Sequence, residues 1–273
     1  MDREDEQQAL HEYYVLGLEQ SRLDSGPGLV EFERTKEIVL RHLPDARCDV
    51  ADIGGGPGRY ALWLAGLGYA VRHRDLVSLH VEQLTAASAG RDDIDTAVCD
   101  ATRLDLDDQA VDAVLLLGPL YHLPRRRDRL QALREARRIV TPGGPVFVAA
   151  ISRWAARLNG VLVEQLYRHL PEILDEVERV ERSGELRPLF PGSFTGYSHR
   201  PRQLAAELRA AELDVVDLVA VEGPTALVPD LTERMKDPID TQVVLEAARA
   251  LERVPELLGA GSHLIATGRR PAH

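Results

Sequence analysis

The feature that most constrains the fold is a regular alternation of short apolar runs and helical stretches between residues 48 and 151. The runs typical of strands lie at 48–53, 69–75, 96–100, 111–118 and 145–151, and the helical stretches between them lie at 59–67, 79–89 and 127–140. Strands and helices that alternate at this pace form βαβ units, in which helices cover both faces of a parallel sheet. Because 111–118 and 145–151 are apolar almost throughout, we expect them at the buried centre of the sheet.

The parts of the chain before and after this alternation have a different pattern. Before it, apolar residues recur at helical spacing, and Pro44 ends the segment. After it we expect helix over 154–183, an irregular loop over 182–198, helices at 202–211 and 241–258, and strands at 214–223 and 262–268. With no internal repeat or long linker, the sequence predicts a single domain, 1–273. Its parts are a helical cap (1–44), a cofactor-binding core (45–151), an insertion or lid (152–200) and a C-terminal part of the sheet (201–273).

Composition narrows the possible partners. The formal net charge of -11 disfavours nucleic acid, because phosphate contacts dominate that kind of binding. The basic run Arg125, Arg126 and Arg127 is typical of a solvated helix start. The acidic first residues, MDREDEQQ, do not resemble a signal peptide, and no apolar run reaches the roughly 18 residues of a membrane span. We therefore expect a cytoplasmic protein without a membrane partner.

The sequence does not predict a metal site. Cys48 and Cys99 form no CxxC pair, and no histidines and carboxylates cluster along the chain at ligand spacing. We therefore expect free thiols and no bound metal.

A glycine-rich loop, DIGGGPG at 52–58, follows the first expected strand. Glycines at 54, 56 and 58 allow positive φ angles and a close approach of a ligand to the backbone. Asp75 ends the second expected strand, at about the offset where a carboxylate accepts hydrogen bonds from ribose hydroxyls. The loop lacks the GxGxxG pattern of nicotinamide enzymes, because Arg59 takes the last position, and it lacks GK[ST]. An oxidoreductase is therefore a weaker alternative, as is a tight turn without a ligand.

Segment 50–75, VADIGGGPGRYALWLAGLGYAVRHRD, resembles the first two motifs of class I S-adenosylmethionine-dependent methyltransferases, whose loop is (D/E)xGxGxG. Later pieces resemble the family in the same order, namely CDATRL (99–104), DAVLLLGPLYHL (112–123) and LREARRIVTPGG (133–144). More narrowly, GPLYHL, FTGYSHRP (194–201) and VEGP (221–224) resemble bacterial members of the small-molecule type.

The resemblance implies a Rossmann-like, seven-stranded sheet whose last strand is antiparallel, and S-adenosyl-L-methionine as cofactor. It implies that Asp75 holds the ribose, that Asp100 holds the adenine amino group, and that Asp52 and the 54–56 backbone face the methionine end. The cofactor-binding candidates are Asp52, Gly54, Gly55, Gly56, Asp75, Leu76, Asp100, Ala101, Leu117 and Gly118.

Catalytic and acceptor-binding candidates lie outside the glycine loop. His122 follows the fourth strand and is a candidate general base, because imidazole titrates near neutrality. Tyr121 beside it is a second catalytic candidate, with a role as a wall of the site as the alternative. The candidate acceptor contacts are Tyr13, Tyr14, Arg22, Arg153, Tyr197 and His199. For each of these candidates the alternative is a structural role, which is packing or, for Arg153, an ion pair.

The sequence thus predicts a methyltransferase acting on O, N or C of a small molecule, in specialised metabolism for example. A peptide or protein methyltransferase and a non-catalytic S-adenosylmethionine-binding protein are the alternatives. The pattern indicates neither the acceptor nor the oligomeric state.

Overall fold

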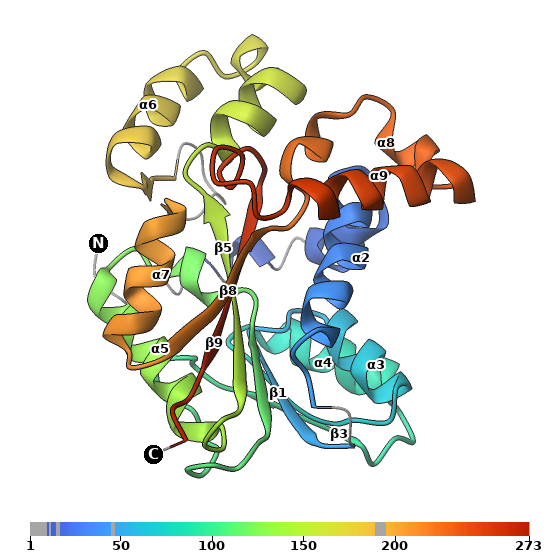
Figure 1. Cartoon of the computed structure of the whole chain (residues 1–273), viewed down its shortest axis with the longest axis vertical. Helices are drawn as coiled ribbons and strands as arrows, with labels where there is room; N and C mark the ends of the chain where they lie inside the picture. Colours follow the sequence, from blue (N-terminus) through green and yellow to red (C-terminus); the bar gives the residue numbers. More distant parts are fainter. Residues whose placement is uncertain (1–9, 11, 15–16, 45–46, 189–194, 273) are drawn as a thin grey trace.

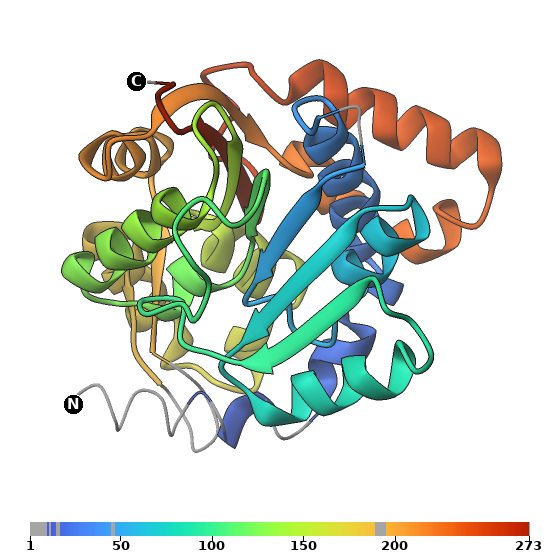
Figure 2. The same ribbon diagram turned by 90° about the horizontal axis from the view of Figure 1, so that it is seen from below.

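The computed structural model describes residues 10, 12–14, 17–44, 47–188 and 195–272. Five parallel strands form its centre, in the order β3-β2-β1-β4-β5. They are β1 (Asp49–Ile53), β2 (Ala70–Asp75), β3 (Ile94–Val98), β4 (Ala113–Leu116) and β5 (Pro145–Ser152). Seen from below, β1, β2 and β3 lie side by side with the twist of a parallel sheet (Figure 2). β4 is fully buried, as its apolar sequence predicts.

The last strand of the chain runs against the others. β9 (His263–Arg269) pairs antiparallel with β5 on one side and with β8 (Asp214–Ala220) on the other. The seven-stranded, mostly parallel sheet with an antiparallel last strand is therefore confirmed. Two short strands add to it. β6 (Glu185–Leu186) pairs with β7 (Gly196–His199), and β7 pairs in parallel with the carboxyl end of β5.

Helices cover both faces of the sheet (Figure 1). On one face, α5 (Arg126–Ile139) and α7 (Pro201–Ala210) pack against apolar residues of β1, β4, β5 and β9. On the other face, α2 (Pro27–Leu40), α3 (Arg59–Gly66) and α4 (Ser78–Ala87) pack against β1, β2, β4 and β5. α9 (Pro238–Leu251), preceded by the short α8 (Leu231–Arg234), lies against α2. Both cores lie below the carboxyl ends of the strands, which leaves that edge for a site.

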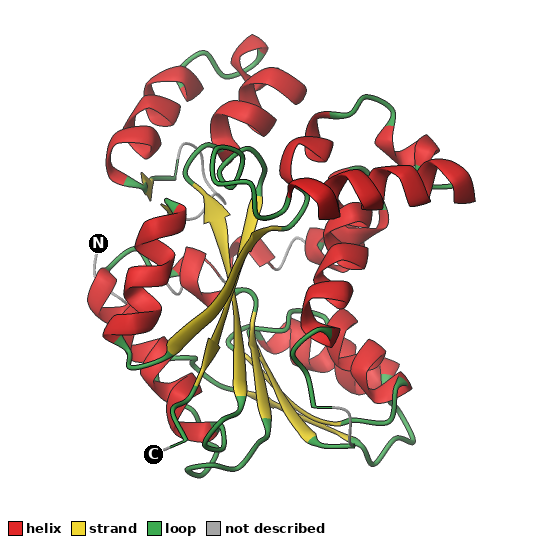
Figure 3. Ribbon diagram, in the orientation of Figure 1, coloured by secondary structure: helices red, strands yellow, loops and turns green. Residues whose placement is uncertain are grey.

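Extra elements gather at this carboxyl edge (Figure 3). The cap contributes a helical piece at 12–14, the 3₁₀ helix η1 (Leu18–Asp24) and α2. The stretch expected to be helical over 154–183 is divided into a π-helical segment η3 (Ala156–Val163), a short η4 (Leu166–Arg168) and α6 (Ile173–Ser183). Pro171 lies in the break before α6, and proline cannot continue a helix. The other short 3₁₀ helices are η2 (Pro119–His122) and η5 (Gly223–Leu227).

Among the described residues, no helix has the length and apolar character needed to cross a membrane. The acidic first nine residues and segment 189–194 of the insertion lie outside the described part of the chain.

Candidate active site

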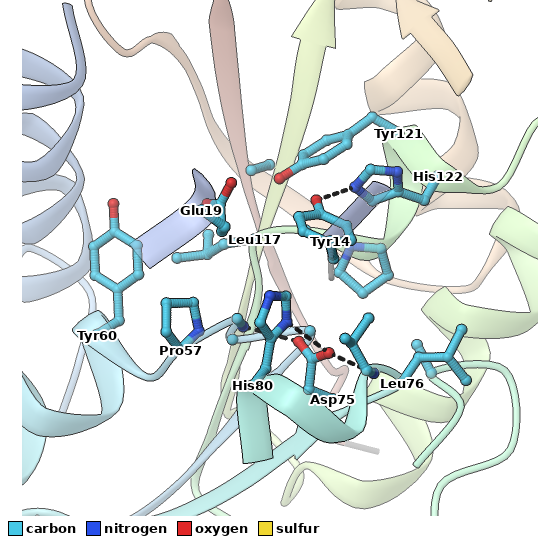
Figure 4. Close-up of a pocket in the computed structure, with 18 of the residues that line it drawn as sticks. Tyr14, Glu19, Pro57, Tyr60, Asp75, Leu76, His80, Leu117, Tyr121 and His122 are labelled. Carbon is cyan, nitrogen blue, oxygen red and sulfur yellow. Dashed lines mark hydrogen bonds and ion pairs between the residues drawn. The ribbon is translucent and has the colours of Figure 1, made fainter. Parts of the chain in front are cut away.

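A pocket opens at the carboxyl edge of the sheet, between the glycine loop and the N-terminal cap (Figure 4). One half is lined by the loop after β1, the end of β2 and residues 99–101 after β3. The other half is lined by η1, α2 and the start of β9. We call these the loop half and the cap half. Tyr121 and His122 of η2 line the pocket between them.

The glycine loop has the backbone geometry that its sequence predicts. Gly54 and Gly56 have φ angles of 67° and 58°, in the left-handed region that favours glycine. A Cβ atom on Gly54 would lie 2.6 Å from the ring of Pro119, so a side chain there would push β1 and η2 apart. A Cβ atom on Gly56 would meet only the Cγ of Glu19, at 3.7 Å. The backbone at Gly56 is thus open towards the pocket.

Asp75 fixes this loop against the end of β2. Its two carboxylate oxygens accept hydrogen bonds from the backbone N–H of Gly56 and of Val77, both at 2.8 Å, and Nδ1 of His80 lies 3.1 Å away. Burial opposes ionisation of Asp75, but the contacts with His80, Val77 and Gly56 hold its pKa below the usual value. Asp75 is therefore a buried anion at the floor of the loop half.

Asp52 lies beneath the same loop and has a different environment. Its side chain is 0% exposed, and neither carboxylate oxygen has a hydrogen-bond partner among the described residues. Burial, and then the nearby charge of Asp75, raise its pKa to about 7. A buried carboxylate without partners is costly, and its ionised form gains from any positive charge brought close to it.

Asp100 and its neighbours form the far wall of the loop half. Oδ1 of Asp100 accepts hydrogen bonds from the backbone N–H and the hydroxyl of Thr102, both at 2.8 Å. Leu76 and Ala101 line the pocket beside it.

Tyr14 of the cap closes over His122. The Tyr14 hydroxyl lies 2.7 Å from Nε2 of His122, and its ring meets the ring of His80 edge to face. Burial lowers the pKa of His122 to about 3 and raises that of Tyr14 well above its usual value. Both groups are therefore neutral at physiological pH, and this hydrogen bond joins two uncharged partners.

The cap half contains a cluster of charges drawn from four elements. Nδ1 of His263 lies 2.5 Å from Oε1 of Glu222 and 3.5 Å from Oε2 of Glu31. Glu31 also forms a two-pronged ion pair with Arg22, at 2.5 and 3.0 Å, and Arg22 contacts Glu19 at 2.7 Å. Burial alone would lower the pKa of His263, but Glu31 and Glu222 raise it to about 9. The position of this imidazole therefore stabilises a positive charge.

Comparison with known proteins places this architecture in a family. Residues 51–148 match the model of a methyltransferase domain. The chain is 30% identical over 141 residues to the probable tRNA methyltransferase 9B of Bos taurus, covering 50% of this chain and 26% of that protein. It is 34% identical over 122 residues to the ubiquinone/menaquinone biosynthesis C-methyltransferase UbiE of Acidiphilium cryptum, covering 43% of this chain and 48% of that protein. The alignments thus span less than half of either relative.

A solved structure shows the same fold over most of the chain. The SAM-dependent methyltransferase of Methanosarcina mazei has a TM-score of 0.59 and 17% identity, covering 86% of this chain and 98% of that one. Residues 51–148 thus form a methyltransferase domain, and the chain has the fold of class I S-adenosylmethionine-dependent methyltransferases.

The fold of this methyltransferase brings most of the sequence-predicted residues to one pocket. Those that line it are Tyr14, Arg22, Gly54, Gly55, Gly56, Asp75, Leu76, Asp100, Ala101, Leu117, Gly118, Tyr121 and His122. Asp52 lies directly under Gly55, whose Cβ would come 2.4 Å from its Oδ2. Tyr13 packs edge to face against Tyr14, with ring centroids 5.0 Å apart, and is not among the residues that line the pocket.

Three residues expected at the acceptor, Arg153, Tyr197 and His199, lie in a separate buried network. Arg153 donates to Oε1 of Gln203 at 2.8 Å, and Nε2 of His199 lies 3.2 Å from Glu207. The guanidinium of Arg129 lies 3.6 Å from the centre of the Tyr197 ring and pairs with Glu207. None of the three lines the pocket described above, because β7 pairs with β5 and these side chains contact α5 and α7. A role for them at the acceptor stays a prediction.

Sequence reasoning missed His80, Glu31 and His263. Glu222 lies in the VEGP segment that the sequence singled out, but the residues of the cap-half cluster lie far apart in sequence. The cluster was not predicted because only the antiparallel pairing of β9 places His263 beside the end of β8. His80 lies in the first turn of α4, five residues after Asp75, and the bend between β2 and α4 brings the two side chains together.

Proposed function

We propose that this methyltransferase transfers a methyl group from S-adenosylmethionine to a small-molecule acceptor held in the cap half. The observation that carries the proposal is the continuity of the two halves of one pocket. The loop half has the glycines and carboxylates of the family motif, and the charged cap half adjoins it under Tyr14. A donor and an acceptor held side by side need mainly alignment and exclusion of water.

The loop half fits the cofactor. The Gly56 backbone is open towards the pocket, and a side chain at this position would extend into that space. The partnerless carboxylate of Asp52 below the loop favours a ligand that carries positive charge, as a sulfonium and an α-ammonium do. Asp75 would hold ribose hydroxyls and Asp100 the adenine amino group. The cofactor would supply an already activated methyl group.

The chain's own residues then position and enclose the reactants. Leu117 and Gly118, at the end of β4, form the surface between the two halves. Tyr14 from the cap and Tyr121 from η2 cover the boundary between the two halves. His122 orients Tyr14 through their hydrogen bond. Because His122 is neutral with a depressed pKa, it is better suited to this positioning than to taking a proton.

A tRNA acceptor is the second candidate, because one relative is a probable tRNA methyltransferase. The arginine run at the start of α5 does not form an unpaired basic patch. Arg125 and Arg127 lie 2.9 and 3.3 Å from Asp128, and Arg126 lies 4.0 Å from Glu207. With an overall charge of -11, this arrangement favours a small molecule over a polyanion.

Calorimetry and turnover test the proposal. S-adenosylhomocysteine should bind the purified protein with a stoichiometry near one, while NAD should give no heat. Small acceptors should support formation of S-adenosylhomocysteine from S-adenosylmethionine, whereas unmodified tRNA should not. Heat from NAD without heat from S-adenosylhomocysteine would refute the cofactor assignment. Turnover on tRNA alone would establish the second candidate.

A further inference from the structure

The cap half contains more negative than positive charge. Three carboxylates lie in the cluster, Glu19, Glu31 and Glu222, against one permanent cation, Arg22. Glu222 is 0% exposed and Glu31 is 8% exposed, so solvent screens this excess only weakly. His263 lies between two of these carboxylates, Glu31 and Glu222, where its protonated ring supplies a second positive charge and reduces the excess negative charge.

Apolar side chains surround this cluster. Leu23, Leu117, Ala149, Val221 and Ile265 line the same part of the pocket as Glu31 and His263. A ligand here therefore has an apolar body and one polar group that meets the carboxylates. An anionic group would face uncompensated carboxylates, while a cationic group would complement them.

We propose that the acceptor is an amine carried on an apolar body, with its nitrogen beside Glu31 and His263, and that His263, oriented by Glu222, receives the proton that the ammonium loses. This inference rests on the methyltransferase function proposed above. The contact between Nδ1 and Glu222 leaves Nε2 as the ring atom that meets a ligand in the pocket. A base oriented by a carboxylate is a recurrent arrangement for proton transfer.

The charges balance throughout such a transfer. In the free protein His263 carries a proton, and this proton is released to solvent as the ammonium binds. The ammonium then gives one proton to Nε2 of the neutral imidazole. The nitrogen lone pair then forms a bond to the methyl carbon, while the carbon–sulfur bond breaks and leaves its electron pair on sulfur. The positive charge of the sulfonium thus ends on the methylated nitrogen, where Glu31 stabilises it. An alcohol that lost its proton would give a neutral ether, and the carboxylates would have no new cation to stabilise.

The proton affinities agree with this geometry. The charged groups that face His263 are Glu31 from α2, Glu222 from the segment after β8, and Arg22 from η1. Burial and Arg22 lower the pKa of His263, but Glu31 and Glu222 outweigh them and raise it to about 9, near the roughly 10.4 of an aliphatic ammonium such as lysine. His122, whose pKa is lowered to about 3, is a much weaker acceptor.

Binding of matched probes to the complex with S-adenosylhomocysteine tests the inference. We would titrate benzylamine, 2-phenylethylamine and 3-phenylpropylamine, each against the alcohol of equal length, and 3-phenylpropionate as the anion. At least one amine should bind about tenfold or more tightly than its alcohol, since a charged hydrogen bond is gained. The anion should bind most weakly. At pH 7.5 amine binding should release about one proton per site, because the bound amine and His263 then share one proton. The release is measured by comparing the heat of binding in buffers of different ionisation enthalpy.

Variants identify the residues responsible. Glu31→Gln should reduce the amine preference about tenfold, and His263→Gln should abolish the proton release. Glu33→Gln is the matched control, because Glu33 lies on the same helix but pairs with Lys36 at 2.7 Å. Circular dichroism and S-adenosylhomocysteine affinity verify that each variant is folded. If a variant does not fold, the preference of the unaltered protein for amine over alcohol and its proton release still decide whether the amine inference holds.

The outcomes separate the two proposals. If S-adenosylhomocysteine does not bind, the methyltransferase function itself is wrong. If it binds but no amine exceeds its alcohol, or amine binding releases no proton, only the amine inference is overturned.

Discussion

The hydroxyl of Tyr14 lies 2.7 Å from Nε2 of His122, so a residue of the N-terminal cap closes directly over the loop that follows β4. Both partners are half-buried and neutral, and the ring of Tyr14 also meets His80, which contacts Asp75. The cap is thereby linked to the floor of the loop half through side chains alone. We therefore expect ligand binding in the loop half to change the stability of the cap.

Removal of either partner should loosen the cap without changing the pH profile. Tyr14→Phe leaves the buried Nε2 of His122 without its bond to the hydroxyl, at a cost of about 1–3 kcal/mol. In hydrogen exchange, residues 17–30 should be protected by S-adenosylhomocysteine in the unaltered protein and less so in Tyr14→Phe. Residues 195–200 should change little, because β7 belongs to the separate network. Equal protection of both segments would contradict this view of the cap.

His122→Ala distinguishes positioning from general-base catalysis. Burial lowers the pKa of His122 to about 3, so it remains neutral above pH 5 and titrates below any useful assay range. The variant should turn over more slowly through loss of the Tyr14 contact, yet the shape of its pH–rate curve should be unchanged. A loss of about 100-fold that fades as pH rises would instead restore His122 as the base.

Asp75→Asn should weaken S-adenosylhomocysteine by roughly 10- to 100-fold, since a charged hydrogen bond contributes about 1.5–3 kcal/mol. The asparagine keeps the size of the side chain and can still accept from Gly56 or Val77, which limits damage to the loop. Asp95→Asn, on the exposed face of β3, is the control and should bind normally. Calorimetry at one ionic strength measures both. An unchanged dissociation constant in folded Asp75→Asn would show that the ribose is held elsewhere.

Asp52→Asn should stabilise the ligand-free protein at alkaline pH. Burial, reinforced by Asp75, raises the folded-state pKa of Asp52 from 3.8 to about 7. Stability is therefore greatest below pH 4 and falls as pH rises towards 7, by at most about 4 kcal/mol. Thermal melts should show the variant several degrees more stable at pH 8, with the difference shrinking towards pH 4. The same variant should bind the cationic cofactor more weakly. No stabilisation at pH 8 would show that Asp52 ionises without penalty.

Glu207→Gln tests the structural reading of the network around His199 and Arg129. Burial opposes ionisation of Glu207, but His199 and Arg129 lower its pKa to about 2. The stabilisation is present above pH 4.5 and is lost as pH falls towards 2. The variant should lose about 3 kcal/mol of unfolding free energy at pH 7. Glu212→Gln, which breaks the exposed pair with Arg137, should cost under about 1 kcal/mol. If folded Glu207→Gln binds S-adenosylhomocysteine with an altered affinity, the network around Glu207 contributes to the active site, and its purely structural interpretation is wrong.

The cofactor side of the pocket could be predicted from sequence because its determinants are local. Strand periodicity placed Asp52 and Asp75 at adjacent strand ends, and the glycine spacing matched the positive φ angles of Gly54 and Gly56. These features depend on neighbours a few residues away or on one parallel pairing. The family resemblance then supplied the expected role of each residue.

The cap side could not be predicted because its determinants are tertiary. Glu31, Glu222 and His263 read in sequence as unrelated polar residues in a helix, a strand end and a strand start. The place of Tyr197 and His199 outside this pocket could not be predicted, because the pairing of β7 with β5 was not evident in a segment that reads as loop. The helical stretch expected over 154–183 ignored the break at Pro171, which local sequence did signal. The cytoplasmic location and the single-domain division stay predictions.

The position of β9 has a consequence for the order in which a growing chain acquires its parts. The strands that carry the glycine loop, Asp75 and Asp100 have all been synthesised once the ribosome passes Ser152. His263 lies at the head of β9, so the cap-half cluster cannot form until the chain has been synthesised as far as this strand. A chain that stalls before β9 therefore has the segments of the cofactor cradle but lacks His263, and with it one of the charges around the proposed acceptor site.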